Sequence, residues 1–283
     1  MLSRVTAGPY TVRGLSLGGI YTSLCVPELR LLLDIGIAPR SFVGMDTMLL
    51  SHGHVDHVGS LSVLLGLRGL AMKDKPLRVM MPAEIVEPLQ RALVAMTEMQ
   101  QYDLSVDAVP MVAGDEAPLR TDHIVRAFRT RHPVPSLGYQ VVRKVQKLRD
   151  EFRSLSGEEI GRRRKAGDDL FRQVETVELA YATDTLIEAL DDTPSVYDAR
   201  VLVMECTFLD NKKSRAESRA GCHIHLDEII ERADRFNNEH IVLMHFSQLY
   251  RPDEVRELLA ARCPPALLER IHPLVPSHRV WPG

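Results

Sequence analysis

Three imidazoles and one carboxylate, side chains of the kinds that bind transition metals, lie within six residues of one another: His52, His54, Asp56 and His57. Neutral imidazole and carboxylate are the usual zinc ligands in proteins. His52 and His54 share one side of the chain only where the backbone is extended, whereas Asp56 and His57 project in another direction at the start of a helix. The spacing therefore favours two neighbouring metal ions over one. With 11 histidines in 283 residues, three within six positions exceed what an ordinary polar loop carries.

The elements around this motif place it on a loop between a strand and a helix. An apolar run at residues 45–50 predicts the strand, and an apolar helical pattern over residues 57–72 predicts the helix. Other strands are predicted at residues 10–12, 21–26, 30–35, 77–81, 105–109, 124–131, 137–143, 174–183, 201–205 and 241–245. Other helices are predicted at residues 83–99, 226–236 and 252–261, and the glycine-rich residues 14–19 indicate a turn. A strand-rich first half followed by alternating strands and helices predicts two sheets with helices outside them.

Three further polar residues stand where a predicted strand gives way to a loop. His132 follows the strand at residues 124–131, Asp184 follows residues 174–183, and His245 ends residues 241–245. Each alone is typical of an exposed strand end, but strand ends in layered folds are also where site residues gather. We expect the three side chains together to complete the ligand sets that the histidine motif begins.

Composition indicates the class of protein but not its activity. The chain is 45% hydrophobic and 26% charged with a net charge of −3, so nucleic-acid binding would have to rest on a local basic patch. No apolar run approaches about 18 residues and no signal-peptide pattern opens the chain, which predicts a cytoplasmic protein without a membrane span. The four cysteines are scattered and predict buried small hydrophobes rather than disulfides. Without a clear linker or repeat, we expect one domain over residues 1–283.

The ordered set of motifs resembles the metallo-β-lactamase superfamily and, within it, the tRNase Z family in its short plant-type form. The superfamily pattern is His-x-His-x-Asp-His at residues 52–57, a strand-end histidine at 132, Asp-Thr at 184–185 and a final histidine in His-Phe-Ser at 245–247. Two segments point to tRNase Z: Met-Glu-Cys-Thr-Phe at residues 204–208 and His-Ile-His at residues 223–225. The likeness extends over nearly the full length of the chain.

The resemblance implies an α/β fold, the αββα sandwich, with two zinc ions at one edge between the sheets. The zinc ligands it implies are the motif and strand-end residues already named: His52, His54 and His132 for the first ion, Asp56, His57 and His245 for the second, and Asp184 for both. Asp34 would orient a ligand histidine from behind.

Cleavage of a phosphodiester beside these ions would need two proton transfers, one from the nucleophile and one to the leaving oxygen. Two zinc ions about 3.5–4 Å apart can share a water, lower its pKa toward about 7 and neutralise charge on the phosphate. By resemblance, Asp56 accepts the proton of the nucleophile, and His223, assisted by Glu205, protonates the leaving ribose oxygen. The residues alone leave His225 as plausible as His223. His225 is also placed to cap a helix that begins at Leu226.

A charged segment, residues 143–173, is the candidate for binding the substrate. It is helix-prone over residues 144–173, and residues 141–165 carry nine basic against four acidic side chains. Such a surplus can bind a phosphate backbone or can be a solvated helical face, and the sequence alone favours neither. Because tRNase Z proteins carry a tRNA-binding arm here, the resemblance implies precursor tRNA as substrate and four basic residues in contact with it: Arg162, Arg163, Arg164 and Lys165. The family also suggests a homodimer.

Three departures from the family pattern bear on the substrate rather than on metal binding. Thr183 and Cys222 stand where the family usually has glycine, and Leu249 stands where it typically has arginine. A hydrolase of small phosphodiesters or other esters on the same scaffold is therefore the main alternative. A metal-binding RNA scaffold without activity is a weaker one, because it would have no use for His223 and Glu205. The favoured interpretation is removal of the 3′ trailer from precursor tRNA.

Overall fold

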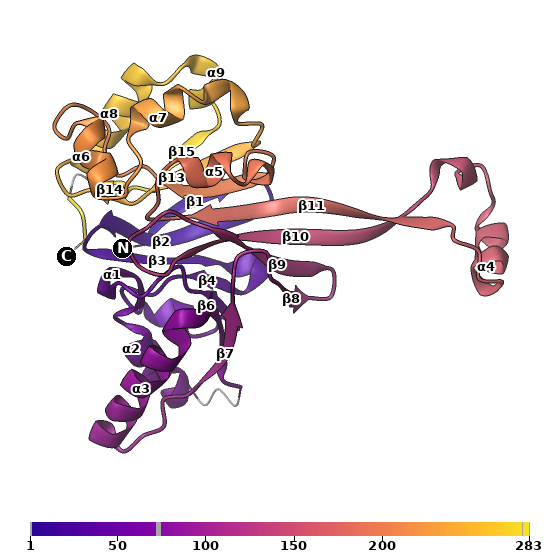
Figure 1. Ribbon diagram of the computed structural model, residues 1–283, viewed down its shortest axis with the longest axis horizontal. Helices are drawn as coiled ribbons and strands as arrows, with labels where there is room; N and C mark the ends of the chain where they lie inside the picture. The colour runs from indigo at the N-terminus through magenta and orange to yellow at the C-terminus, as the bar shows by residue number, and fades with distance from the viewer. Residues whose placement is uncertain (1, 72–74, 279, 283) are drawn as a thin grey trace.

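Two mixed β-sheets packed face to face form the centre of the molecule (Figure 1). The computed structural model describes residues 2–71, 75–278 and 280–282. The first sheet consists, in spatial order, of β1 (Ser3–Ala7), β2 (Tyr10–Gly18), β3 (Tyr21–Val26), β4 (Leu31–Leu33), β5 (Thr47–Leu49), β6 (Leu77–Pro82) and β7 (Val106–Met111), with β14 (Phe246–Ser247) also paired to β2. The second consists of β15 (Ile271–Pro273), β13 (His240–Met244), β12 (Val201–Glu205), β11 (Phe171–Ala182), β10 (Leu137–Leu148), β9 (His123–Arg129) and β8 (Glu116–Arg120).

Helices cover the outer face of each sheet (Figure 1). Outside the first sheet lie α1 (Val55–Val58), α2 (Leu61–Leu70) and α3 (Ala83–Gln100). Outside the second lie α5 (Glu188–Asp191), α6 (Arg215–Ala220), α7 (Leu226–Ile230), α8 (Pro252–Arg262) and α9 (Pro265–Leu268). Short 3₁₀ turns are η1 (Pro27–Leu29), η2 (Arg40–Phe42), η3 (Asp150–Phe152), η4 (Pro194–Val196) and η5 (Ala233–Arg235). The expected αββα sandwich is confirmed, and none of the described helices is long and apolar enough to cross a membrane.

The alternation of side chains along buried strands builds the apolar layers. In β12, Val201 and Val203 belong to the layer between the sheets, whereas Leu202 and Met204 belong to the layer under the C-terminal helices. The strand is buried on both faces, as interior parallel strands are. Because both faces of such strands are filled by apolar side chains, polar site residues can be presented only at strand ends.

The turn predicted at residues 14–19 is wrong, since residues 14–18 continue β2. Gly14 pairs with Leu24, and a Cβ on it would lie 2.0 Å from the carbonyl oxygen of Ser23. Glycine is therefore required for close approach of two strands rather than for a turn.

Two predicted helices are each divided. Residues 57–72 correspond to α1 and α2, with residue 72 outside the described part of the chain, and residues 226–236 form α7 and η5.

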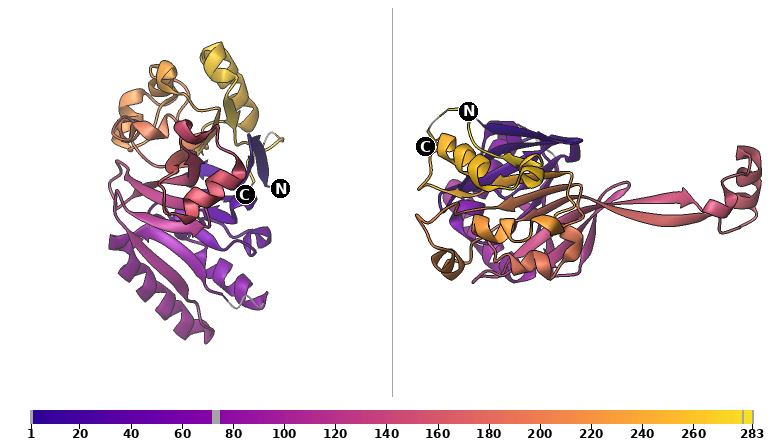
Figure 2. Two further views of the ribbon diagram at one scale, coloured as in Figure 1. Left: turned by 90° about the vertical axis from the view of Figure 1, so that its right-hand side faces the viewer. Right: turned by 90° about the horizontal axis from the view of Figure 1, so that it is seen from above.

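The charged segment is a long β-hairpin rather than a helix. β10 and β11 pair from Tyr139 with Tyr181 out to Leu148 with Phe171, and the right-hand view of Figure 2 shows the hairpin projecting far beyond the sheets. At its tip, η3 and α4 (Gly157–Lys165) interrupt the extended chain. Cross-strand valine pairs, residues 142 with 177 and 145 with 174, favour the strands. The helix predicted over residues 144–173 is therefore wrong except at these short tip elements.

Candidate active site

Strands of both sheets end at the edge where the motif residues lie. The strands and the residues that follow them are β5 with His52, β9 with His132, β11 with Asp184 and β13 with His245. In the second sheet, β11, β12 and β13 are parallel, and two antiparallel pairings give β9 the same direction. Their carboxyl ends therefore meet at one edge, the usual position of sites in open α/β sheets. The side chains expected to converge do lie together there.

One group brings three imidazoles and a carboxylate around a common point: His52, His54, His132 and Asp184. His52 Nε2 lies 3.1 Å from His54 Nδ1, which in turn lies 3.3 Å from His132 Nε2. Two nitrogens bound to one tetrahedral zinc at about 2.0–2.1 Å are about 3.3 Å apart. The spacing of these nitrogens therefore fits a shared metal ion.

A second group lies against the same aspartate and consists of Asp56, His57 and His245. Asp184 Oδ1 lies 3.3 Å from His57 Nε2 and 3.2 Å from His245 Nε2. Asp56 Oδ2 lies 3.5 Å from His57 Nε2. Both of these ring nitrogens are buried and form no hydrogen bond of good geometry. Buried polar atoms need a partner, and a cation bound between these two nitrogens and the nearby carboxylates would supply one. Asp184 would then belong to both groups.

His223 lies beside both groups, with Glu205 behind it. Its Nδ1 is 3.2 Å from Glu205 Oε1, and its ring centre is 5.4 Å from that of His245 and 6.4 Å from that of His132. Burial opposes protonation of His223, but the Glu205 carboxylate outweighs it and raises the pKa of His223 to about 9. The imidazolium can therefore donate a proton at neutral pH. His223 is also close enough to His245 and Asp184 to form a third group of possible ligands.

His225 faces away from this cluster and caps α7. Its Nδ1 accepts a hydrogen bond from the backbone N–H of Asp227, and its Nε2 donates to the backbone carbonyl of Asp210. The expected helix cap is therefore confirmed. Both ring nitrogens of this buried side chain are therefore held by the cap rather than at the cluster.

Known proteins resemble the chain over most of its length. Residues 25–246 match the family model described as the β-lactamase superfamily domain. The chain is 36% identical over 258 residues to tRNase Z TRZ1 of Arabidopsis thaliana, which covers 90% of this chain and 92% of that protein. The chain belongs to the tRNase Z family. The chloroplastic tRNase Z TRZ2 of the same plant is 33% identical over 88% of this chain and 70% of that protein.

Solved structures of tRNase Z and of a related protein share the fold. The short form of human tRNase Z has a TM-score of 0.52 at 18% identity and covers 88% of this chain and 91% of that chain. The metallo-β-lactamase fold protein YhfI from Bacillus subtilis has a TM-score of 0.61 at 16% identity and covers 95% of this chain and 97% of that chain. At these identities the likeness concerns the fold alone, which is the one expected for tRNase Z.

Behind the cluster, a buried carboxylate fixes two of the rings. Asp34 Oδ2 accepts from His57 Nδ1 at 2.7 Å, from Ser51 Oγ at 2.7 Å and from the Tyr181 hydroxyl at 2.6 Å. Because the Ser51 proton goes to Asp34, Ser51 Oγ accepts from His52 Nδ1 at 2.9 Å. Both rings therefore turn Nε2 toward the cluster. The resemblance indicated Asp34, whereas Ser51 and Tyr181 were missed as supports because no local pattern marks them.

A second chain of hydrogen bonds holds His245. Thr207 Oγ1 donates to Glu205 Oε2 at 2.6 Å and accepts from His245 Nδ1 at 3.1 Å. Glu205 is fully buried and also accepts from the backbone N–H of Thr185. One carboxylate thus orients both His223 and His245. Thr207 was also missed, although it lies in the family segment at residues 204–208.

Burial and neighbouring charges set the protonation states in the cluster. Burial lowers the pKa of His52 to about 2. Burial opposes ionisation of Asp184, but His245 and His57 outweigh it and hold the pKa of this carboxyl well below its usual range. Neutral imidazole and ionised carboxylate are the forms that bind a divalent cation. His57 differs: burial lowers its pKa, but Asp184 and Asp34 raise it further, so a metal at Nε2 must displace a proton.

The strand ends turn sharply where the cluster residues sit. The φ angle is +57° at Asp34, +40° at Asp184 and +60° at His245. Such backbone conformations cost of order 1–3 kcal/mol each and gather at functional sites. Thr183 does not have a positive φ, and its hydroxyl donates to Asp184 Oδ1 at 2.8 Å. Cys222 does, at +57°, and it is partly exposed rather than buried as predicted.

The basic residues of the arm lie outside the cluster, and so does Leu249, which stands where the resemblance led us to expect an arginine. All four arm residues singled out from the sequence belong to α4, at the far end of the hairpin in Figure 1. Leu249 is half exposed, and Lys212 Nζ lies 3.4 Å from its carbonyl oxygen. A lysine that is itself paired with Glu254 therefore lies beside the position where the resemblance led us to expect an arginine.

Proposed function

We propose that the chain removes the 3′ trailer from precursor tRNA as a zinc-dependent endonuclease. Relatives that match most of it carry the name tRNase Z. The observation that carries the proposal is His223, an imidazole held by Glu205 beside both ligand groups. A ribose oxygen is a poor leaving group that needs a proton donor at this point, whereas a scaffold that only binds metal or RNA does not.

We propose two zinc ions per chain, held by the residues whose donor atoms converge. His52, His54 and His132 would hold one, Asp56, His57 and His245 the other, and Asp184 both. Such ions lower the pKa of a bound water and neutralise charge on a phosphate.

The proton transfers belong to the chain's own side chains. Asp56, whose carboxylate lies in the second group, would accept the proton of the attacking water. His223 would donate its proton to the leaving ribose oxygen, while Glu205 stabilises the imidazolium and holds Nδ1. Together, the two transfers leave a 3′-hydroxyl on the tRNA and a 5′-phosphate on the trailer.

The proposal is tested by cleavage of labelled precursor tRNA beside hydrolysis of bis-p-nitrophenyl phosphate. We expect a single cut that removes the trailer, is lost on chelation and returns with zinc. Hydrolysis of the small ester without cleavage of tRNA would overturn the RNA assignment and leave the alternative ester hydrolase. After zinc-replete expression, metal analysis giving one zinc or none per chain would contradict the two-ion site.

Replacing Asp34 with asparagine is expected to weaken zinc binding about 10- to 100-fold, as loss of a partner behind a metal ligand usually does. The carboxylate accepts hydrogen bonds from His57, Ser51 and Tyr181. The amide nitrogen of asparagine cannot accept, so at least one of these hydrogen bonds would be lost. Competition with a chromophoric chelator measures the affinity. Tyr181→Phe is the matched control, because it removes one donor and leaves the carboxylate. Unchanged affinity in Asp34→Asn would show that Asp34 does not orient the ligands.

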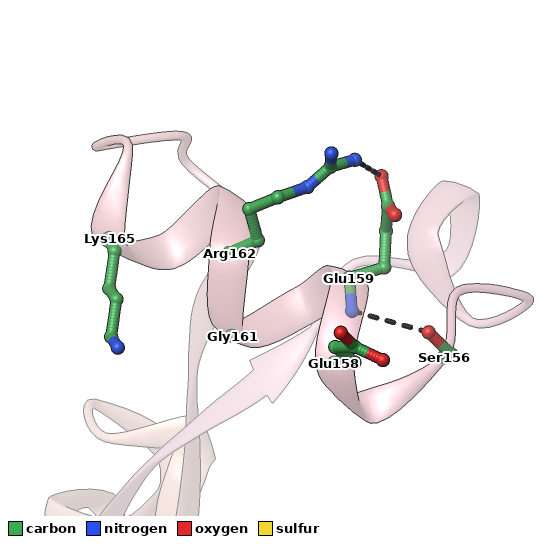
Figure 3. Close-up of a pocket in the computed structure, with 6 residues that line it drawn as sticks. All are labelled: Ser156, Glu158, Glu159, Gly161, Arg162 and Lys165. Carbon is green, nitrogen blue, oxygen red and sulfur yellow. Dashed lines mark hydrogen bonds and ion pairs between the residues drawn. The ribbon is translucent and has the colours of Figure 1, made fainter.

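The arm is the second part of the proposal, with α4 as the tRNA-binding element. Figure 3 shows its tip, a hollow of about 600 Å³ lined by Ser156, Glu158, Glu159, Gly161, Arg162 and Lys165. Arg162 turns toward Glu159 at 2.7 Å, whereas Lys165 points away from it. Arg163 also pairs with Glu159, and Arg164 lies over the Phe171 ring. Local acids thus offset part of the positive surplus counted in the sequence.

Changing Arg162, Arg163, Arg164 and Lys165 together to glutamine is expected to weaken tRNA binding and flatten its salt dependence. Removing one phosphate-binding cation lowers the slope of log K against log salt by roughly 0.7–0.9. Filter binding at several salt concentrations measures both quantities. Glu158→Gln, on the same exposed helix, is a control of opposite sign that should tighten binding. Unchanged affinity and slope in the quadruple variant would exclude α4 from RNA binding.

We propose a homodimer, as the family suggests. Support comes from exposed apolar side chains on α2, α3 and the residues that follow them: Val63, Leu70, Val94, Met99 and Tyr102. Apolar surface of this kind marks interaction sites when it is contiguous. Sedimentation equilibrium distinguishes a dimer from a monomer.

We also propose that residues 1–283 form one domain with an arm over about residues 143–173, and that the protein acts in the cytoplasm. The pairing of β10 and β11 continues from the sheet into the arm, which supports a single unit. Relatives include a chloroplastic tRNase Z and a nuclear ribonuclease Z. Limited proteolysis tests the first proposal, and cell fractionation tests the second.

A further inference from the structure

The helix that precedes the proposed proton donor, α6, has almost no apolar surface to hold it against the rest of the protein. Its one buried residue is Ser218. The backbone carbonyl of Ser218 accepts from the N–H of His223 at 3.0 Å, and its hydroxyl donates to the backbone carbonyl of His223 at 2.8 Å. The main chain of His223 is therefore fixed to α6, and the position of α6 decides where His223 lies.

Arginine side chains attach α6 to the neighbouring helices α5 and α7. Arg219 donates to the fully buried Glu228 of α7 at 2.6 Å and to Glu188 of α5 at 2.8 Å. Arg215 lies 3.5 Å from Glu228 and 2.6 Å from Glu231, which follows α7. Within the described part of the chain, Arg219 alone connects α6 to α5 by an ion pair.

The start of α5 is itself tied to the ligand groups. The helix begins at Glu188, close after Asp184 in the chain. Between these two residues, the hydroxyl of Thr185 accepts from the backbone N–H of Arg131 at 2.8 Å, and Arg131 is the neighbour of His132. Glu188 therefore belongs to the segment that presents the shared carboxylate, and that segment is bound to the strand end that presents a ligand histidine.

We infer that Arg219 is a positioning residue for the proton donor, an inference that rests on the proposed function. The planar guanidinium can bond two carboxylates at once, and through Glu188 and Glu228 it sets the distance of His223 from the ligand groups. Glu205 fixes the direction of the ring at Nδ1, whereas Arg219 holds the helix to which the main chain of His223 is bound. A displacement of about 1 Å at a reacting group can slow a reaction about 10²-fold.

The experiment measures the single-turnover rate of precursor tRNA cleavage, the Kd for that RNA and the hydrolysis of bis-p-nitrophenyl phosphate. For Arg219→Met we expect tRNA cleavage to slow about 10- to 100-fold, with Kd and zinc content unchanged. Hydrolysis of the small ester should stay within about twofold, because nitrophenolate leaves without a proton. Arg219→Lys keeps the charge but lacks the fork that spans two carboxylates, so it should recover only part of the rate.

Three comparisons isolate the route by which Arg219 acts. In a His223→Ala protein, Arg219→Met should have no further effect on tRNA cleavage, because a positioning residue acts only through the group that it positions. Glu188→Gln should slow tRNA cleavage selectively, and combining it with Arg219→Met should slow it no more than Arg219→Met alone. Arg215→Met is the matched control, since this arginine of the same helix shares Glu228 but not Glu188, and it should keep the wild-type rate.

The outcomes separate this inference from the function on which it rests. If the wild-type protein hydrolyses bis-p-nitrophenyl phosphate but cleaves no precursor, the proposed function fails and the inference fails with it. With the function intact, equal slowing of both substrates or loss of zinc in Arg219→Met would show that Arg219 only stabilises the metal site. A weaker Kd with an unchanged rate would make it an RNA contact instead.

Two further results would overturn the positioning role: an unchanged rate and Kd in Arg219→Met, or equal slowing by Arg215→Met. Circular dichroism shows whether each variant is folded. If Arg219→Met does not fold, Arg219→Lys and Glu188→Gln provide the same comparison of tRNA with the small ester, and full activity of both on tRNA would exclude the inference.

Discussion

Replacement of Asp184 by alanine is expected to reduce kcat/KM for precursor tRNA by at least about 10³-fold, equivalent to a loss of about 4 kcal/mol. The reason is its position between the two ligand groups. Its Oδ1 lies 3.3 Å from His57 Nε2 and 3.2 Å from His245 Nε2, and its Oδ2 lies 3.9 Å from His52 Nε2. The substitution therefore removes a donor from both groups, and zinc content should fall together with activity.

Folding and catalysis must be separated in this experiment, because Asp184 is buried and stabilises the protonated ring of His57. Asp184→Asn keeps the shape of the side chain, and thermal unfolding followed by circular dichroism shows whether each variant is folded. Thr183→Val is the matched control, since it removes only the hydroxyl that donates to Asp184 and should keep most of the activity. A folded Asp184→Ala variant with full zinc content and near-normal cleavage would exclude the shared carboxylate.

Parts of the fold could be predicted from the sequence because their signals are local. The strand predicted at residues 201–205 is β12, a buried parallel strand that appears as a continuous apolar run. The same run fixes where the strand ends, and hence the place of Glu205. Convergence of the histidine motif with the strand-end residues followed from residue type and strand position. These signals do not depend on the remainder of the chain.

Edge strands and the arm could not be predicted in this way. β8 contains Pro118 and charged residues, and β15 has only three residues including Pro273, so both resemble loops in sequence. In the arm, lysine, arginine and glutamate favour a helix individually, but pairing of β10 with β11 overrides that preference. Such pairing is decided by residues about 30 positions apart, which local propensity does not register.

The supports of the site were missed for a related reason. Ser51, Tyr181 and Thr207 come from three separate segments, and only the folded chain brings them to Asp34 and Glu205. A hydroxyl group carries no sequence pattern that reveals its partner. The choice between His223 and His225 likewise needed the structure, which shows one ring beside the cluster and the other capping a helix.

His223→Ala is expected to lower kcat/KM for precursor tRNA by about 10²- to 10⁴-fold, the usual contribution of a general acid. Hydrolysis of bis-p-nitrophenyl phosphate should fall far less, because nitrophenolate leaves without a proton. The pH dependence adds a second readout. Glu205 raises the pKa of His223 against the effect of burial, so the protonated acid is present at neutral pH and is lost as the pH rises through this pKa. The wild-type protein should therefore lose activity on the alkaline side, and the variant should not show that loss.

Metal content decides between the two roles that the geometry allows for His223. As a general acid it can be removed with both zinc ions retained, whereas as a ligand alongside Asp184 and His245 its removal should release zinc. His225→Ala is the matched control: loss of the cap on α7 should cost about 1 kcal/mol of stability and leave the pH profile intact. If His223→Ala loses zinc, or slows both substrates equally, His223 is not the general acid. Leaving-group protonation would then have to come from another group, and the zinc site would gain a ligand.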